Sequence, residues 1–270
     1  MIGLNDGTRI PQLGFGTFQI DPEDTGAAVA HALDVGYRSI DTAAAYGNER
    51  EVGGAINGSG IDRAELYVTT KLWNSNQGSD RATTAFEESL SKLGLDYVDL
   101  YLIHWPVPSR DLYVETWQAM EELRADGRIR SIGVSNFQES HLDRLADGAD
   151  TVPAVNQIEL HPALQQRRMR EAHAQRGIVT EAWSPLAQGQ LFDDETLGEI
   201  GSGHGKSAAQ TMLRWHMQLG NVTIPKSVNP ERIESNFDIW DFELSQDEMA
   251  AIESLDAGNR IGPDPDEFTG

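Results

Sequence analysis

Short apolar runs alternate with longer amphipathic segments along most of the chain. The runs are rich in β-branched residues, as buried parallel strands are, and each precedes a segment with apolar residues at helical spacing. In 22–35, for example, Ala28, Ala32 and Val35 share one helical face, and Gly36 ends the helix. From Leu13 onward we count eight such strand–helix units. The predicted strands are 13–17, 39–40, 66–71, 98–103, 131–134, 154–158, 178–182 and 222–224. The predicted helices with both ends assigned are 22–35, 81–93, 113–125, 139–145, 165–175, 207–219 and 230–236. A further helix, the second along the chain, is predicted to be capped by Asn48, with Glu51 three residues on as in a capping box.

Eight strand–helix units in one chain of 270 residues predict a (β/α)₈ TIM barrel. The alternative, a doubly wound open sheet, should carry a glycine-rich fingerprint after its first strand, but the segment 14–19, GFGTFQ, lacks the third glycine. Asn5-Asp6-Gly7, flanked by 2–4 and 8–11, predicts an N-terminal β-hairpin within 1–12, and 244–255 predicts one extra helix after the barrel. We expect a single domain over 1–270, in which the acidic, Gly- and Pro-rich tail 257–270 packs as a loop or frays.

The composition narrows the possible functions. Forty-three acidic and 21 basic residues leave a net charge of −22, which repels nucleic acid and anionic membranes. The absence of cysteine excludes disulfides, thiol catalysis and cysteine-ligated metals. The seven histidines lack metal-ligand spacing, the first residues do not resemble a signal peptide, and no apolar run approaches the roughly 18 residues of a membrane span. We therefore expect a cytoplasmic monomer without a metal, a nucleic-acid partner or a membrane.

Ionisable residues stand at the ends of three consecutive predicted strands. Asp41 ends the second strand, Lys71 ends the third, and His104 follows the fourth, while Tyr46 lies on the loop after Asp41. In a TIM barrel these carboxyl ends face one mouth, where the chemistry takes place. Taken singly, Asp41 and Lys71 could form a structural ion pair and His104 could be a core histidine. The conjunction of all four favours a catalytic site.

The four residue types suit proton transfer to a carbonyl group. A buried lysine beside a tyrosine stabilises the phenolate and lowers the tyrosine pKa from about 10, and an acid partner keeps the lysine charged. A histidine can orient the carbonyl group by hydrogen bonding. We expect Tyr46 to act as a general acid near neutral pH.

Three stretches carry a resemblance to a known family: GYRSIDTA at 36–43, IGVSNF at 132–137 and IPKSV at 224–228. From the hairpin to the last barrel helix the chain resembles the aldo-keto reductase superfamily, and it is most similar to bacterial 2,5-diketo-D-gluconate reductases. The resemblance implies a catalytic tetrad of Asp41, Tyr46, Lys71 and His104, with Tyr46 as the proton donor. It also implies NADPH as the cofactor, bound extended across the mouth without a Rossmann motif.

The same resemblance implies a set of cofactor-binding residues, which consists of four groups together with Gly16 and Thr17 of the first predicted strand. Ser135, Asn136 and Gln157 match the contacts to the nicotinamide carboxamide, and Trp183 matches the aromatic residue that stacks on the nicotinamide, where many members have tyrosine. The loop 184–188 matches the pyrophosphate segment, and residues after the last strand match the adenosine-phosphate site, although Ser235 replaces a common glutamate. The full set is Gly16, Thr17, Ser135, Asn136, Gln157, Trp183, Ser184, Leu186, Gln188, Lys226, Ser227, Val228, Asn229, Arg232 and Asn236.

A cationic cluster is needed to prefer NADPH over NADH on so acidic a protein. Lys226 and Arg232 are placed at the loop and helix start after the last strand, where barrels commonly bind phosphate. Alternatively, Arg232 pairs with Glu231 or Glu234 on a solvated helix face.

Four aromatic residues, Phe18, Trp73, Trp105 and Phe137, directly follow predicted strands 1, 3, 4 and 5. We expect them to wall the substrate pocket, an arrangement that suits small carbonyl compounds. The resemblance points to sugar-derived dicarbonyls such as 2,5-diketo-D-gluconate, and to simpler α-dicarbonyls and aldehydes.

Three functions remain after this reasoning. The first is an NADPH-dependent oxidoreductase that reduces aldehydes and ketones to alcohols. The second is a cofactor-binding regulatory protein on the same fold with little turnover. The third, a metal-dependent barrel hydrolase, would need a cluster of histidines and carboxylates at the strand ends with Lys71 as a bridging ligand, and the sequence favours it least.

Overall fold

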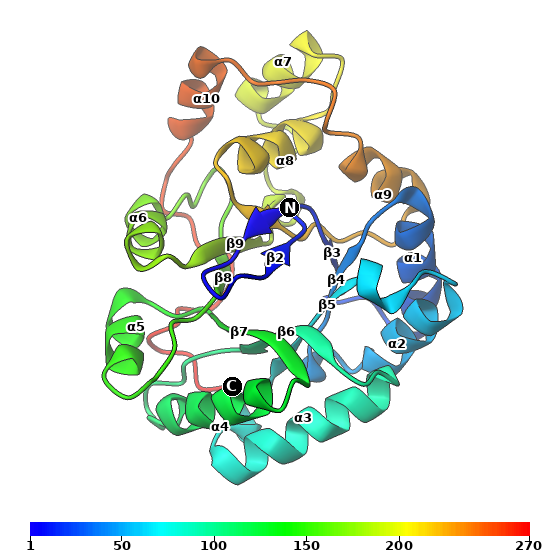
Figure 1. Ribbon diagram of the computed structural model, residues 1–270. Coiled ribbons are helices and arrows are strands. Elements are labelled where there is room, and N and C mark those ends of the chain that lie inside the picture. Colours follow the sequence, from blue (N-terminus) through cyan, green and yellow to red (C-terminus); the bar gives the residue numbers. More distant parts are fainter.

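Eight parallel strands curl around one axis, so the predicted TIM barrel is confirmed (Figure 1). The structure, a computed structural model, describes residues 1–270. Each strand pairs with the next one along the chain, and a parallel bridge between Leu13 and Thr223 closes the ring. The strands are β3 (Phe15–Gly16), β4 (Ser39–Asp41), β5 (Tyr67–Leu72), β6 (Val98–Ile103), β7 (Ile129–Ser135), β8 (Val155–Glu159), β9 (Val179–Trp183) and β10 (Val222–Thr223).

Helices surround the strands (Figure 1). The barrel helices are α1 (Pro22–Val35), α2 (Glu49–Gly58), α3 (Ser79–Leu93), α4 (Tyr113–Ala125), α5 (Glu139–Ala146), α6 (Arg167–Arg176), α8 (Ala208–Gln218) and α9 (Pro230–Phe237). The extra helix predicted after the barrel is present as α10 (Gln246–Glu253), and one helix that was not predicted, α7 (Glu195–Gly203), lies in the β9–α8 connection. Short 3₁₀ turns are η1 (Ala44–Tyr46), η2 (Arg63–Glu65), η3 (Asn74–Asn76) and η4 (Ala187–Gly189).

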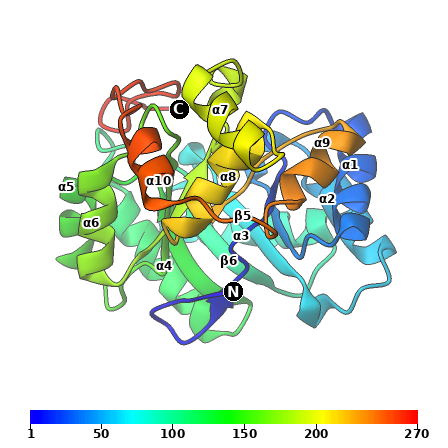
Figure 2. The ribbon, with the colours of Figure 1, turned by 90° about the horizontal axis from the view of Figure 1, so that it is seen from above.

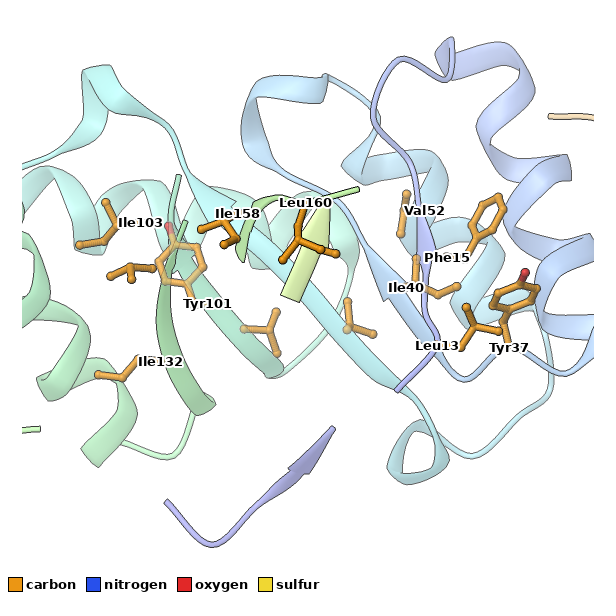
Figure 3. Packing of buried hydrophobic residues seen from close by; sticks show 14 of the residues in the cluster. Leu13, Phe15, Tyr37, Ile40, Val52, Tyr101, Ile103, Ile132, Ile158 and Leu160 are labelled. Atoms are coloured by element: carbon orange, nitrogen blue, oxygen red, sulfur yellow. The ribbon is translucent and has the colours of Figure 1, made fainter. Parts of the chain in front are cut away.

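The main core lies between the strands and the helices. It is a cluster of 49 buried residues, and Figure 3 shows Phe15, Tyr37, Ile40 and Val52 from this layer close together. The rings of Phe15 and Tyr37 meet edge to face at 5.7 Å between centroids. Because outward-facing strand residues are buried here, inward-facing residues at the strand ends are left to line the mouth.

The N-terminal hairpin covers one end of the barrel (Figures 1 and 2). Its strands, β1 (Ile2–Gly3) and β2 (Arg9–Ile10), pair antiparallel as predicted. Leu4 and Ile10 join a second apolar cluster with strand residues such as Leu100 and Val155. The hairpin therefore fills the end of the barrel opposite the carboxyl ends of the strands.

The C-terminal tail packs as a loop at the other end (Figure 2). The amides of Ile261 and Gly262 donate to the buried Glu159 carboxylate, at 2.6 and 2.8 Å. Further on, the Phe268 ring lies 4.4 Å from the Trp105 ring, centroid to centroid. These contacts place the tail beside the mouth, although the sequence left open whether it packs or frays.

The capping box predicted at Asn48 is wrong. The Asn48 side chain makes no capping bond to α2; it accepts from the Thr42 hydroxyl at 2.9 Å and donates to the Thr17 carbonyl at 3.0 Å. It is fully buried between the loops that follow β3 and β4, so the loops rather than the helix end take up its hydrogen bonds. None of the helices combines the length and the apolar character that a bilayer crossing requires.

Candidate active site

The structure brings Asp41, Tyr46, Lys71 and His104 together at the mouth. Asp41 ends β4, Lys71 lies in β5, His104 directly follows β6, and Tyr46 ends the turn η1. The Lys71 ammonium donates to Asp41 Oδ1 at 2.6 Å and to the Thr42 carbonyl at 3.0 Å, and it lies 3.3 Å from the Tyr46 hydroxyl. Lys71 is fully buried, so its charge is directed at these three oxygen atoms alone.

Lys71 is charged at neutral pH. Burial lowers the pKa of Lys71, but the charge of Asp41 and its hydrogen bond, together with Tyr46, more than offset burial, and the pKa lies above its usual 10.5. The ammonium group is therefore a fixed positive charge beside the tyrosine.

Tyr46 is held in its protonated form, which differs from the expectation of a lowered pKa. Burial of the hydroxyl raises the pKa of Tyr46 above 10, and the opposing effect of Lys71 does not overcome it. Asp41 also disfavours the phenolate. The resting site therefore holds a proton on Tyr46 at neutral pH, which is the state that a general acid needs.

His104 is neutral. Burial and the nearby Lys71 charge lower the pKa of His104 well below 6.5. The imidazole packs edge-on against Tyr46 and Trp73, at 5.6 and 5.2 Å between centroids, and its buried Nδ1 has no hydrogen-bond partner. A neutral imidazole in this position can offer an N–H to a carbonyl oxygen without adding charge.

A buried acid that the sequence analysis did not single out completes the polar interior. Glu181, on β9, accepts from Gln157 Nε2 at 3.0 Å, and the same nitrogen donates to Asp41 Oδ2 at 2.9 Å. Burial and the neighbouring Asp41 raise the pKa of Glu181 to about 8. The sequence shows Glu181 as an acid inside an apolar strand. It stands two residues before Trp183, so the two side chains lie on the same face of the strand.

The predicted carboxamide-binding residues lie together at the ends of β7, β8 and β9. Asn136, at a positive φ of 64°, donates to the His104 carbonyl at 3.0 Å and accepts from the Trp183 indole at 2.8 Å. Ser135 donates to the Gln157 backbone carbonyl at 2.9 Å. Gly262 of the tail lies so close to the Trp183 ring that a side chain there would collide with it. The Trp183 ring is therefore held by the Asn136 hydrogen bond and by the close packing of Gly262.

The loop after β9 holds an unusual backbone. Ser184, Ala187 and Gln188 all have positive φ angles, of 48°, 49° and 52°, while Leu186 packs against the core. Non-glycine residues adopt such angles rarely, and they cluster at ligand-binding segments. The loop therefore fits the predicted pyrophosphate segment.

Two exposed cations follow β10 without any acidic partner. Neither Lys226 nor Arg232 forms an ion pair, and Glu234, the proposed competitor for Arg232, is 3.2 Å from His31 instead. Asn229 caps α9 by accepting from the Arg232 backbone N–H at 3.0 Å. Unpaired cations near a helix start provide a place for a phosphate group.

The remaining predicted cofactor residues differ in accessibility. Val228 is exposed and Asn236 is buried in the same region, and Ser227 accepts from the Asn229 amide at 3.1 Å. Thr17 is fully buried and donates its hydroxyl to the Asp41 carbonyl at 2.9 Å, so its side chain serves the strand end. A Cβ at Gly16 would meet the carbonyl oxygen of Ile224, the residue after β10, at 2.8 Å, so this close backbone approach explains the glycine.

Two of the four predicted substrate-pocket aromatics pack against tetrad residues, and Trp105 is connected to them through Phe268, whose ring lies near both Trp105 and Trp73. Phe18 is 48% exposed, with its ring 5.0 Å from that of Tyr46, and Trp73 contacts His104. Trp105 is buried beneath Phe268. The fourth assignment, Phe137, requires correction.

Phe137 does not face the mouth. Its side chain is 1% exposed and packs edge-on against Tyr113 and His141 in the main core. The strand-end position suggested a pocket residue, but the chain turns at Asn136 and directs the following side chain outward to α4 and α5. Phe268 provides an aromatic side chain at the mouth instead, and no pattern in the tail sequence indicated its partners.

Comparison with known proteins agrees with this geometry. The family model "Aldo/keto reductase family" matches residues 12–257. An aldo-keto reductase of Mycobacterium sp. (strain KMS) is 62% identical over 268 residues, covering 99% of this chain and 97% of that protein. The methylglyoxal reductase DkgA of Escherichia coli (strain K12) is 52% identical over 272 residues, covering 100% and 98%. A solved structure of a Gox0644 variant in complex with NADPH superposes with a TM-score of 0.95 at 47% identity, covering 99% and 97%. Its fold, its polar strand ends and its sequence together show that this chain belongs to the aldo/keto reductase family.

Proposed function

We propose that this NADPH-dependent, carbonyl-reducing oxidoreductase acts on small dicarbonyl compounds, with Tyr46 as the proton donor. The observation that carries the proposal is the protonated Tyr46 hydroxyl 3.3 Å from the buried Lys71 ammonium, with neutral His104 beside it. Hydride transfer to a carbonyl carbon builds negative charge on the oxygen, and this arrangement offers that oxygen two hydrogen-bond donors, Tyr46 and His104, of which Tyr46 also gives up its proton.

The proposed roles follow from the charges of the residues. Tyr46 gives its proton to the carbonyl oxygen, and Lys71 stabilises the phenolate that remains until water returns a proton. His104 orients the carbonyl oxygen. Bound NADPH supplies the hydride, and Gln157, Trp183 and the loop 184–188 are the residues that would hold its nicotinamide and pyrophosphate.

Small, uncharged substrates fit the surroundings best. Phe18 and Trp73 pack against tetrad residues, and the rings of Phe268 and Trp105 extend this apolar surface from Trp73. The turn that carries Phe268 also contains Asp264, Asp266 and Glu267, which oppose an anionic substrate. The name of the 52% identical Escherichia coli relative, a methylglyoxal reductase, supports a small α-dicarbonyl. Sugar-derived dicarbonyls such as 2,5-diketo-D-gluconate belong to the same proposal, with less favourable binding because they carry a carboxylate.

A steady-state assay of NADPH oxidation tests the substrate class. We expect turnover with methylglyoxal and with 2,5-diketo-D-gluconate, and a higher kcat/KM for the uncharged compound at low salt. Raising the salt concentration should narrow the difference, because it screens the acidic tail. Activity confined to large steroid ketones would contradict the small-substrate proposal. NADPH binding without turnover of any carbonyl would favour a cofactor-binding regulatory protein.

Arg232→Ala tests the phosphate site. A charge-assisted hydrogen bond contributes about 1.5–3 kcal/mol, so the variant should bind NADPH about tenfold or more weakly. NADH lacks the 2′-phosphate, and its dissociation constant should hardly change. Arg9→Ala, on the hairpin at the opposite end of the barrel, is the matched control and should change neither value. An equal increase in the NADPH and NADH dissociation constants of Arg232→Ala would show that the arginine does not bind the 2′-phosphate.

A further inference from the structure

Glu181 lies inside the barrel, directly below the mouth. On β9 it is in register with Gln157 of β8 and Val222 of β10, and its side chain is 1% exposed. Burying a carboxyl group is costly unless it has hydrogen-bond partners. The Gln157 amide is the partner that the structure provides.

Gln157 is held by two acids at once. Its Nε2 donates to Asp41 Oδ2 at 2.9 Å and to Glu181 Oε2 at 3.0 Å. A primary amide has two N–H groups and one carbonyl oxygen, so both of its donors are used. The carbonyl oxygen Oε1 is the one group that this amide can still offer to a ligand, and it can only accept a hydrogen bond.

We propose that Glu181 is a positioning residue, which fixes the Gln157 amide so that its carbonyl oxygen accepts from the carboxamide N–H of the bound cofactor. The inference rests on the proposed placement of the nicotinamide at Gln157. Asp41 alone would bind only one of the two N–H groups of Gln157. The amide could then rotate so that its nitrogen, and not its carbonyl oxygen, faces the mouth. The second acceptor removes that alternative orientation.

The charges around Glu181 are compatible with its role as a hydrogen-bond acceptor for the Gln157 amide. The charged and titratable groups near it are Asp41 of β4, Lys71 and Tyr67 of β5, and Tyr46 of η1, while β10 contributes only Val222. One buried cation faces two buried acids, and the pKa of Glu181, raised to about 8 by burial and by Asp41, keeps it neutral at pH 7. A neutral carboxyl group still accepts through its carbonyl oxygen, without a second negative charge beside Asp41.

A pair of cofactors isolates the proposed contact. NADP⁺ carries the carboxamide, whereas its 3-acetylpyridine analogue has a methyl ketone in that place and no N–H. The dissociation constants of both would be measured by isothermal titration calorimetry for the wild type, for Glu181→Gln, which keeps an acceptor oxygen, and for Glu181→Met, which removes it. The ratio of the two constants reports the hydrogen bond itself.

We expect the wild type and Glu181→Gln to prefer NADP⁺ by about three- to tenfold, the usual effect of one hydrogen bond, and Glu181→Met to lose this preference. Glu181→Ala is a second, smaller acceptor-free variant should methionine prevent folding. Equal weakening of both ligands in the acceptor-free variants would reveal a merely structural role and overturn the proposal. A wild type that binds neither ligand would overturn the proposed function itself.

A second measurement needs no ligand. An unfolded glutamate releases its proton near its ordinary pKa of 4.5, and Glu181 in the folded chain releases it near 8. The folded chain therefore holds one more proton between these values, and its stability should fall as the pH rises from about 5 to about 8. The melting temperature of Glu181→Gln should lack this part of the decline. Identical pH profiles for the two proteins would contradict the described environment of Glu181.

Discussion

Replacing Tyr46 by phenylalanine will reduce kcat for carbonyl reduction by at least about 10², the scale of general acid catalysis. The variant keeps the ring, which packs against Phe18 and His104, but loses the proton and the contact to Lys71. Because the lost group acts on the developing charge of the transition state, kcat should fall far more than the affinity for NADPH.

Single-turnover kinetics with preloaded NADPH would measure the chemical step directly, and cofactor titration would show that binding persists. Tyr97→Phe is a suitable control, since Tyr97 packs between Arg63 and Arg130 and not at the mouth. Near wild-type turnover by Tyr46→Phe would mean that another group donates the proton, with His104 the next candidate.

Asp41→Asn should lower the free energy of unfolding by about 3–5 kcal/mol, because removing one partner of a buried ion pair leaves the other charge uncompensated. Lys71 is fully buried, and its shortest contact is the 2.6 Å bond to Asp41. In the variant the pKa of Lys71 should fall below its unfolded value of about 10.4. The unfolded chain then binds more protons than the folded chain at intermediate pH, so stability should recover as the pH rises.

Urea denaturation at pH 7 and at pH 9.5 would test both parts of this expectation. The double variant Asp41→Asn/Lys71→Met removes the stranded charge and should be more stable than Asp41→Asn alone at pH 7. A loss below about 1 kcal/mol for Asp41→Asn, or a loss that does not shrink at high pH, would indicate that solvent reaches Lys71 and relieves its charge.

The placement of the tetrad could be predicted because the barrel repeats. Asp41, Lys71 and His104 each end or follow a strand, and parallel strands bring these ends to one mouth whatever the details of packing. The pKa shifts of the tetrad residues were harder to predict from the sequence. Whether Lys71 or burial dominates the pKa of Tyr46 depends on how completely the hydroxyl is enclosed, and the sequence does not contain that quantity.

Contacts between distant segments could not be predicted. Phe268 reaches Trp105 across more than half of the sequence, and Glu159 meets the amides of Ile261 and Gly262 from a different element. For Asn48 and Phe137 the local sequence pattern predicted the wrong role. Asn48 hydrogen-bonds to the neighbouring loops and does not cap α2, and Phe137 packs against α4 and α5 and does not line the mouth. Acids inside otherwise apolar strands, Glu159 in β8 and Glu181 in β9, are the local signals of these buried polar contacts.

The two ends of the chain lie at opposite ends of the barrel (Figure 2), and this has a practical consequence for handling the protein. Met1 adjoins the hairpin, away from every group that the chemistry uses. Gly270 lies beside Asn74, the first residue of η3, and a Cβ added to Gly270 would lie 2.9 Å from the Asn74 amide nitrogen. An affinity tag or a surface linker attached at Met1 leaves the pocket open to solvent. The same attachment at Gly270 places a foreign peptide at the entrance and would alter the apparent substrate range.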